Sequence, residues 1–220
     1  MPYRRTEQVV RKLHARHDAI LAAARALAAE GGIGSVQIAP VAERAGIAAG
    51  TVYRYFPAKI DLIAALVAVQ AETEMAALDR AAEAAPGPLS ALAAAIATFA
   101  ARAVANPRLA FALMAAPVEA DLAPVRASFR QTIAAAFAQR IRRAIAAGHL
   151  AEQDAALASV TLIGGLIEGL VGPLAPVANG DLATRRAQVQ MLTLFMLRGL
   201  GIIDARARGL VVQIALPRDC

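Results

Sequence analysis

This sequence is poor in the residues on which disulfide-rich folds and cysteine-ligated metal sites depend. Its single cysteine is Cys220, so no internal disulfide can form. Tryptophan is absent, aromatic residues make up 4% of the 220 residues, and Lys12 and Lys59 are the only lysines among 23 basic residues. These absences exclude a small disulfide-stapled secreted fold, and we predict neither a metal nor a cofactor.

Long hydrophobic runs are also missing, although hydrophobic residues make up 58% of the chain and the mean hydropathy is +0.51. Much of that total is alanine, whereas a membrane-spanning helix requires about 20 predominantly apolar residues in succession. The two most apolar stretches, residues 86–101 and 155–167, fall short because two prolines open the first and Glu168 ends the second. Charged residues throughout residues 4–18 leave no secretory segment there. We therefore expect a cytoplasmic protein with no membrane span.

Motifs of the common enzyme classes are missing as well. The sequence has no Gly-x-Ser-x-Gly string, no His-Glu-x-x-His pair and no glycine loop that follows a strand pattern. The spacing of His14 and His17 would suit a metal, but both lie in a basic helix, which favours a solvated or DNA-facing role. The sequence therefore predicts a protein that is not an enzyme.

Positive charge is concentrated at the N-terminal end of the chain. Residues 1–60 carry nine basic and four acidic side chains, a net charge of +5 out of the +6 of the whole chain. A cationic end on a nearly neutral chain favours a polyanion as partner. On charge alone, a merely solvated basic face is the alternative.

Strand patterns are nearly absent, and only residues 211–216 resemble a short strand. Apolar residues recur with helical spacing instead, and glycine or proline separates the helices, so the expected fold class is all-α. The first helix ends at Gly31-Gly32 and is expected to bury Leu13, Ile20, Leu21, Ala24, Leu27 and Ala28. The other expected helices are 37–45, 49–56, 59–84, 89–105, 107–115, 122–147, 153–171 and 182–199. Residues 201–220 carry no firm prediction.

Two short helices around Gly46 have a physical logic of their own. Glycine permits the tight left-handed turn that a Cβ would obstruct. The second helix can bury Val52 and Phe56 on one side. Its other long side chains are those of Thr51, Tyr53, Arg54 and Tyr55. Because the major groove of B-DNA admits one α-helix and presents donors and acceptors to it, this helix is a candidate DNA reader.

The string from Gly46 to Lys59, Gly-Ile-Ala-Ala-Gly-Thr-Val-Tyr-Arg-Tyr-Phe-Pro-Ala-Lys, resembles the DNA-binding domain of the TetR family of bacterial regulators. The resemblance extends back to Ile20-Leu21 and forward through Asp61-Leu62-Ile63, so it covers about the first 65 residues. It implies an N-terminal three-helix helix-turn-helix domain at 1–60 and a helical domain for ligand binding and dimerisation at 61–200. Residues 201–220 remain a tail.

The resemblance also implies DNA-contacting roles for the matching positions. Tyr53 and Lys59 fall where phosphates are contacted, and Lys59 starts a helix whose dipole also attracts anions. Gly50 allows a close approach, and Arg54 reaches a phosphate or a guanine edge. The full set of predicted DNA-binding residues is Gln37, Ala49, Gly50, Thr51, Tyr53, Arg54, Tyr55 and Lys59. For Tyr53 and Tyr55, the alternative is partial burial in the core. For Arg44, a solvated position and a DNA contact are equally favoured.

Two positions depart from the family pattern. Relatives often begin the first short helix with threonines, whereas this chain has Val36 and Gln37, which leaves Ser35 as the predicted cap. Ala48 stands where relatives often have serine. Backbone contacts, Arg54 and a basic N-terminal arm are therefore expected to supply more of the affinity for DNA. The arm carries Arg4, Arg5, Arg11 and Lys12, and disorder of this arm is the alternative.

A homodimer is expected because one short reading helix makes too few base contacts, and a twofold axis doubles the readout of a palindromic operator. Helix 182–199 is apolar on nearly every side, so one face can pack inside its own subunit and the other against a symmetry mate. Helix 153–171, which contains Gly165-x-x-x-Gly169, joins it in a four-helix interface. A wholly internal helix 182–199 is the alternative.

The resemblance further implies a pocket for an unknown small-molecule effector in the C-terminal domain. The candidate apolar lining is Phe99, Phe111, Met114, Phe129, Ile133 and Phe137, each of which is otherwise plain core. The candidate polar anchors are Arg102, Glu119, Arg130, Thr161 and Glu168. Low aromatic content favours an apolar or aliphatic effector. The prediction is a ligand-responsive transcriptional regulator, a repressor by preference, that binds a double-stranded DNA operator. The alternative is an all-helical lipid carrier or membrane-surface binder without DNA activity.

Overall fold

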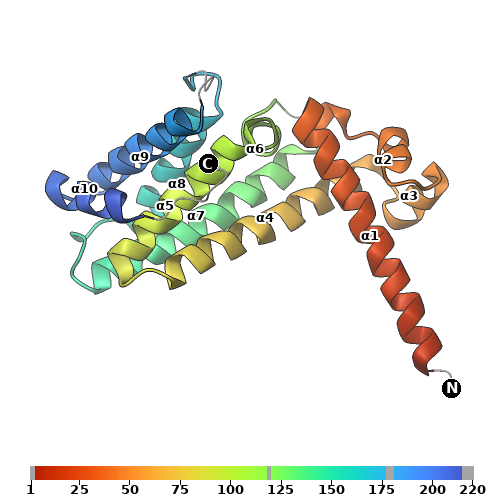
Figure 1. Ribbon diagram of the computed structural model, residues 1–220, viewed down its shortest axis with the longest axis horizontal. Helices are drawn as coiled ribbons and strands as arrows, with labels where there is room; N and C mark the ends of the chain where they lie inside the picture. The colour runs from red at the N-terminus through yellow and green to blue at the C-terminus, as the bar shows by residue number, and fades with distance from the viewer. Residues whose placement is uncertain (1–2, 118–119, 177–180, 215–220) are drawn as a thin grey trace.

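The computed structural model describes residues 3–117, 120–176 and 181–214, and within these ranges it contains helices and no strand. Figure 1 shows an elongated molecule in which helices α1–α3 form a unit at one end and α4–α10 form a bundle. The helices are α1 (Tyr3–Gly31), α2 (Ile38–Arg44), α3 (Ala49–Tyr55), α4 (Lys59–Glu83), α5 (Pro88–Ala105), α6 (Pro107–Met114), α7 (Ala123–Ala146), α8 (Ala155–Leu170), α9 (Leu182–Gly199) and α10 (Asp204–Gln213), with a 3-10 turn η1 (Ile33–Ser35). The all-α prediction is confirmed.

Helices α1, α2 and α3, called here the N-terminal unit, enclose a small apolar core. Ile20 of α1, Val41 of α2 and Val52 of α3 are fully buried. Leu13 is 48% exposed, so its predicted place on the buried face is wrong. The reason is visible in Figure 1, where the first half of α1 projects beyond α2 and α3. The predicted basic arm is therefore a helical extension of α1 rather than a separate disordered segment.

Helix α4 joins the N-terminal unit to the bundle, and α5 lies at the centre of the bundle. α5 packs against α4, α7 and α9, and eleven of its eighteen residues are buried. By length and composition it is the one helix within the described ranges that could cross a membrane. Its position accounts for this composition, because a helix surrounded by other helices is apolar on every side.

The four-residue repeat of apolar residues on α7 marks the face that meets α4, α5 and α8. Phe129, Ile133, Phe137 and Ile141 of this repeat are buried, and Ile145 at its end is half-buried. Phe137 is fully buried and meets Phe99 of α5 edge to face, with ring centroids 6.2 Å apart. The helical period of this segment therefore identified the covered face of α7.

Two local predictions differ from the structure. Residues 211–213 end α10 rather than forming a strand, because Val211 is buried one turn after Ala207 on a helical face; residues 215 and 216 lie outside the described ranges. Ser35 lies in η1, and α2 begins after Gln37 without a side-chain cap. Asn179 and Gly180, which separate the two helices expected at 153–171 and 182–199, also lie outside the described ranges.

Asp154 caps the first turn of α8. Its Oδ1 accepts hydrogen bonds from the backbone N–H groups of Ala156 at 2.8 Å and Leu157 at 3.1 Å. Because loss of an N-cap acceptor costs about 1 kcal/mol, we expect Asp154→Ala to lower the free energy of unfolding in urea by that amount. The control is Glu152→Ala on the same exposed loop, which should change stability by less than about 0.5 kcal/mol. Equal losses in the two variants would contradict the capping role.

Candidate DNA-binding and ligand-binding sites

The turn between α2 and α3 is built on Gly46. Its φ of 65° lies in the left-handed region, which glycine adopts without strain. The backbone N–H of Ile47 donates to the carbonyl of Ala42 at 3.0 Å and closes the end of α2. Val52 and Phe56 are both buried and anchor α3 from beneath. Because these two residues face the core, the opposite side of α3 faces away from the protein.

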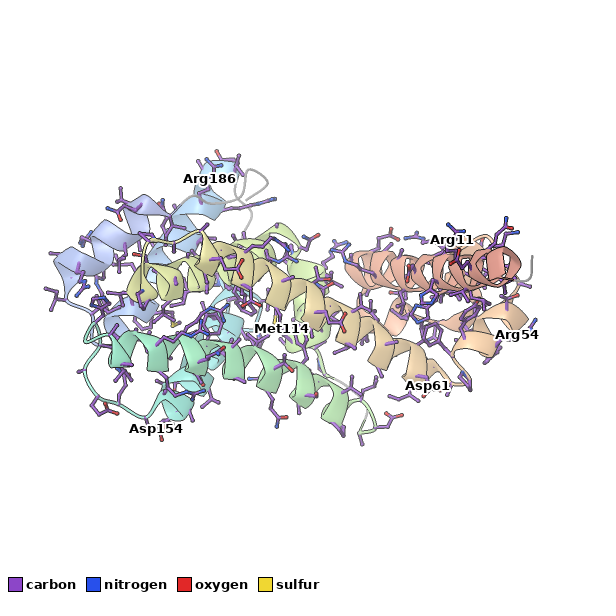
Figure 2. The ribbon with its side chains drawn as sticks, turned by 90° about the horizontal axis from the view of Figure 1, so that it is seen from below. Arg11, Arg54, Asp61, Met114, Asp154 and Arg186 are labelled. Atoms are coloured by element: carbon purple, nitrogen blue, oxygen red, sulfur yellow. The ribbon has the colours of Figure 1, made fainter. Side chains whose placement is uncertain are left out.

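The outer side of α3 carries most of the side chains predicted to meet DNA. Tyr53 is 52% exposed, Arg54 is exposed, and Ala49 and Thr51 are half-buried. Nothing lies within 4 Å of the position that a Cβ on Gly50 would take. Figure 2 shows Arg54 of α3 at the same end of the molecule as Arg11 of α1, so that this end presents cations from two helices.

Tyr55 points inward, which departs from its predicted place at a DNA groove. Its hydroxyl oxygen is buried, and its ring lies against His17 of α1 with centroids 6.3 Å apart. Phe56 meets the same imidazole at 5.3 Å. The physical reason is that a seven-residue helix must use some long side chains to hold itself in place. Tyr55 and His17 thus position α3 against α1, and His17 is not simply solvated.

Gln37 and Lys59 lie at the two ends of the α2–α3 segment. Gln37 is exposed, and its side-chain amide donates to the carbonyl of Gly34 at 3.0 Å. Lys59 is the first residue of α4 and is half-buried. The backbone N–H of Ala58 donates to the carboxylate of Asp61 at 2.9 Å. The Asp61 carboxylate therefore caps the backbone at the start of α4. The Lys59 ammonium is the group at this helix end that can bind a phosphate.

Arg44 is engaged within the N-terminal unit. Its guanidinium donates two hydrogen bonds to the Glu30 carboxylate, at 2.5 and 2.8 Å. This hydrogen bonding lowers the pKa of Glu30 and raises the pKa of Arg44. The pair ties the end of α1 to the end of α2, which favours a structural role for Arg44 over a DNA contact. The side chains of Arg4 and Arg5 lie outside the described part of the chain.

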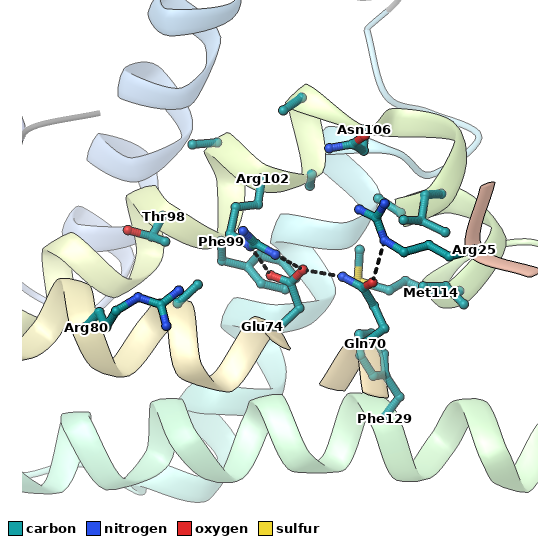
Figure 3. Close-up of a pocket in the computed structure, with 17 residues that line it drawn as sticks. Arg25, Gln70, Glu74, Arg80, Thr98, Phe99, Arg102, Asn106, Met114 and Phe129 are labelled. Atoms are coloured by element: carbon teal, nitrogen blue, oxygen red, sulfur yellow. Dashed lines mark hydrogen bonds and ion pairs between the residues drawn. The ribbon is translucent and has the colours of Figure 1, made fainter. Parts of the chain in front are cut away.

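A cavity of about 340 Å³ lies where the N-terminal unit meets the bundle (Figure 3). Residues of α1, α4, α5, α6 and α7 line it, and its size falls within the range of small-molecule sites. Four of the predicted ligand residues share its wall, namely Phe99, Arg102, Met114 and Phe129. The structure thus brings together residues from three helices that the sequence placed in one pocket.

The other predicted ligand residues do not line this cavity. Ile133 and Phe137 are buried in the core, and Thr161 is exposed on α8. Glu168 accepts a hydrogen bond from the backbone N–H of Leu174 at 3.0 Å, at the end of α8. The remaining three are Phe111, which is half-buried, Arg130, which is exposed, and Glu119, which lies outside the described residues.

A chain of hydrogen-bonded polar side chains crosses the cavity. Of its members, only Arg102 was predicted from the sequence as a ligand-binding residue. The Glu74 carboxylate accepts hydrogen bonds from Arg102 Nε at 2.7 Å, Arg102 Nη2 at 2.9 Å and the Gln70 amide at 2.7 Å. Gln70 Oε1 in turn accepts from Nε of Arg25, on α1, at 3.3 Å. Hydrogen bonding to Glu74 raises the pKa of Arg102. The chain therefore connects α5, α4 and α1.

The signal that could have revealed this chain lies on α4. Gln70 and Glu74 are buried one turn apart, on a helix face whose other members are apolar: Leu62, Leu66, Val67, Ala77 and Leu78. Buried polar side chains need hydrogen-bond partners. Two polar residues inside an apolar stripe therefore predict partners on another helix, although the sequence does not say which helix.

Helices α8 and α9 pack together and leave an apolar surface facing outward. On α8 this surface is formed by Leu157 and Val160, and on α9 by Met191 and Phe195, all more than half exposed. The opposite side of α9 packs inward through Val189 and other buried residues. α9 thus has two apolar faces, one covered by its own chain and one uncovered.

The Gly165-x-x-x-Gly169 motif faces the partner helix within the same chain. A Cβ on Gly165 would lie 2.8 Å from the Met196 methyl group, and one on Gly169 would lie 3.4 Å from Leu192, both on α9. The two glycines therefore allow α8 and α9 to approach each other. The motif is an intrachain packing device and does not lie on the outer apolar surface.

Comparison with known proteins relates the N-terminal part to a single family. Residues 20–66 match the model of the bacterial regulatory proteins of the tetR family. The chain is 46% identical over 67 residues to the transcriptional repressor KstR of Mycolicibacterium smegmatis and 49% identical over 57 residues to KstR of Rhodococcus jostii. These matches span 30% and 26% of this chain, and only 33% and 27% of the two relatives.

Solved structures share the fold over nearly the whole chain. The structure of RolR with its ligand resorcinol is 23% identical, covers 96% of this chain and all of that one, and gives a TM-score of 0.67. The fatty acid degradation regulator FadR from Bacillus halodurans is 21% identical, covers 86% of this chain and 97% of that one, and gives a TM-score of 0.73. FadR from Bacillus subtilis, solved with stearoyl-CoA, is 21% identical over 80% of this chain and 96% of that one, with a TM-score of 0.66. At these identities the likeness establishes the fold. Residues 20–66 therefore place the N-terminal part of this chain in the TetR family of bacterial regulatory proteins.

Proposed function

We propose that this protein is a ligand-responsive transcriptional repressor that binds a palindromic DNA operator as a homodimer and is released by a small effector with an apolar body. The observation that carries the proposal is the construction of α3. Val52 and Phe56 hold the helix from one side while Tyr53 and Arg54 face away from the protein. A cationic side chain and a hydrogen-bonding side chain, exposed together on a positively charged surface, are typical of a helix that binds a polyanion.

The homodimer is supported by the uncovered apolar surface of α8 and α9. Monomeric proteins rarely leave large apolar side chains clustered in water, and a twofold axis through this surface would form a four-helix interface. Two copies of α3 could then enter successive major grooves about 34–36 Å apart. Under this proposal the outer surface of α8 and α9 belongs to the interface, while the glycine motif stays inside each subunit.

The effector site is supported by the cavity that contains Phe99, Arg102, Met114 and Phe129. RolR and Bacillus subtilis FadR, whose folds resemble this one, were solved with resorcinol and with stearoyl-CoA respectively. An effector releases DNA when it prefers a conformer in which the two reading helices no longer match the grooves. Shifting a population from 99:1 to 1:99 requires about 5.5 kcal/mol of preferential binding.

Selection of bound fragments from a random DNA pool tests the proposal. We expect the full-length protein to enrich a palindrome and to bind it in the nanomolar range, with an affinity that falls steeply as salt is raised. Enrichment of no sequence, or binding that salt does not change, would rule out an operator-binding repressor. It would instead favour the all-helical lipid carrier, which binding to phospholipid vesicles would then detect.

Lys59 provides a narrower test of how the protein meets DNA. If its ammonium contacts one phosphate in each half-site, Lys59→Ala removes two contacts per dimer. Because each phosphate contact contributes about 0.9 to the slope of log K against log salt, that slope should become shallower by about 2. Fluorescence anisotropy of the selected fragment over a salt series measures it. Arg142→Ala, on an exposed position of α7, is the matched control, and an unchanged slope for Lys59→Ala would disprove the phosphate contact.

A further inference from the structure

The cavity at the junction of the two parts of the molecule is lined by three arginines and one carboxylate. Arg25 comes from α1, Arg80 from α4 and Arg102 from α5, and Glu74 is the acid. Figure 3 shows the Glu74–Arg102 pair between Arg25 on one side and Arg80 on the other. Since Glu74 and Arg102 neutralise each other through two hydrogen bonds, the charge that remains for a ligand is that of the other two arginines.

Arg25 has hydrogen-bonding capacity to spare. Its Nε donates to Gln70 Oε1 at 3.3 Å, at the long end of the range for such bonds. Its two terminal nitrogens have no partner among the residues that the structure describes. A guanidinium binds a carboxylate through two parallel charge-assisted bonds, which are about twice as strong as bonds to a neutral amide. An acid group in the cavity would therefore outcompete the Gln70 amide for Arg25.

The rest of the lining suits an apolar body attached to such an acid group. Phe99, Leu113, Met114 and Phe129 supply apolar surface, and five alanines leave room between them. The volume of about 340 Å³ fits a molecule of modest size. The class of ligand is thus a small organic anion with a hydrophobic chain or ring.

Arg25 also differs from the other lining residues in where it belongs. It is carried by α1, which packs directly against α2 and whose residues Ile20, Leu21 and Ala24 are buried. One exposed side chain of the cavity lining, that of Arg25, therefore comes from the same unit that carries α3. A second bond crosses the same junction, from Arg108 of α6 to the carbonyl of Glu30 at the end of α1, at 3.1 Å.

We propose that the cavity binds a small organic anion whose acid group is held by Arg25, so that the N-terminal unit contributes a side chain to the effector site. Binding of the acid draws Arg25 from Gln70 and changes the angle between α1 and α4. The position of α3 then follows, because α1 and α3 share one core. This inference rests on the proposed function for its effect on DNA, but its binding site can be tested without DNA.

Calorimetry on the full-length protein tests the site with two probe acids, decanoate and 2-naphthoate, each compared with its neutral amide. Decanoate has an apolar chain and 2-naphthoate an apolar ring, but each carries one carboxylate. Comparing them therefore separates the contribution of the acid group from that of the shape of the apolar body. We expect each acid to bind roughly ten-fold more tightly than its amide, as a charge-assisted bond replaces a neutral one. Arg25→Gln should abolish that preference, and Arg25→Lys should retain part of it.

Two matched variants make the result specific. Arg142→Gln removes the same charge from an exposed site on α7 outside the cavity, and it should leave the preference unchanged. Arg80→Gln removes the other arginine of the cavity. If Arg80→Gln rather than Arg25→Gln abolished the preference, the assignment to Arg25 would be overturned. Equal binding of acids and amides, or no binding of either acid at millimolar concentration, would overturn the ligand class.

The effect on DNA is measured separately with the fragment recovered from the random pool. Saturating acid should weaken binding of this fragment at least ten-fold for the wild type and leave it unchanged for Arg25→Gln. If the wild type recovers no fragment, the proposed repressor function fails while calorimetry still decides the acid site. If the acids bind through Arg25 but leave the affinity for DNA unchanged, the coupling between the cavity and α3 is disproved.

Discussion

Phe195→Glu is expected to turn the homodimer into a monomer. Phe195 is 66% exposed on the outward face of α9, one turn from Met191, which is exposed to the same extent. In a twofold interface the substitution occurs twice, and it places two carboxylates in an apolar contact. Burying an unpaired charge is costly, and truncating an aromatic anchor alone typically costs 2 kcal/mol or more.

The dissociation constant of the dimer should therefore rise by about a thousand-fold or more, since two such losses amount to about 4 kcal/mol. Sedimentation equilibrium at micromolar concentration measures it. Val212→Glu, at an 82% exposed position on α10, is the control, because it adds the same carboxylate at an exposed apolar residue outside α8 and α9, and it should stay dimeric. Monomeric wild type, or a dimeric Phe195→Glu variant, would contradict an interface on α8 and α9.

The bounds of the helices could be read from the sequence because their ends are encoded locally. Gly46 and Gly148 take up positive φ values directly after helices, and prolines begin α5 and α6. Such signals act within a few residues, so a single sequence contains them in full. The apolar period of α7 likewise depends only on its own residues.

The fold of residues 204–213 could not be read in the same way. Valines near the end of this segment favour a strand when taken alone. In the structure α10 packs against α9 and α5, which buries Ala207 and Val211 on one helical face. The surroundings therefore outweigh the local preference, and those surroundings are supplied by helices that lie close in space.

The candidate sites show the same limit. The outer side of α3 follows from which of its residues are buried, so Tyr53 and Arg54 were predicted, whereas the inward turn of Tyr55 depends on His17, 38 positions earlier in the chain. Arg25 is 45 residues from Gln70, its hydrogen-bond partner. The sequence likewise did not show which neighbour the Gly165 side of α8 packs against, because α8 is apolar on both faces. Pairings between distant helices need the fold.

Arg54→Ala is expected to remove most of the affinity for the operator while leaving the fold and the dimer intact. Arg54 is exposed near the end of α3, and within the described ranges no other side chain holds it. Its loss therefore costs no internal contact. A good bidentate contact between arginine and guanine contributes about 1–3 kcal/mol.

Because the dimer presents Arg54 twice, the loss should amount to about 2–6 kcal/mol, or roughly 30-fold to more than 10,000-fold in affinity. Fluorescence anisotropy with the selected palindrome measures the affinity, and the same titration on base-substituted palindromes shows what Arg54 contacts. If it reads a guanine, Arg54→Ala should bind the original and one substituted site equally. If it contacts a phosphate, all sites should weaken together and the salt slope should become shallower by about 2. Arg142→Ala should behave as wild type, and an Arg54→Ala variant that binds with unchanged affinity would show that α3 does not read the operator through this residue.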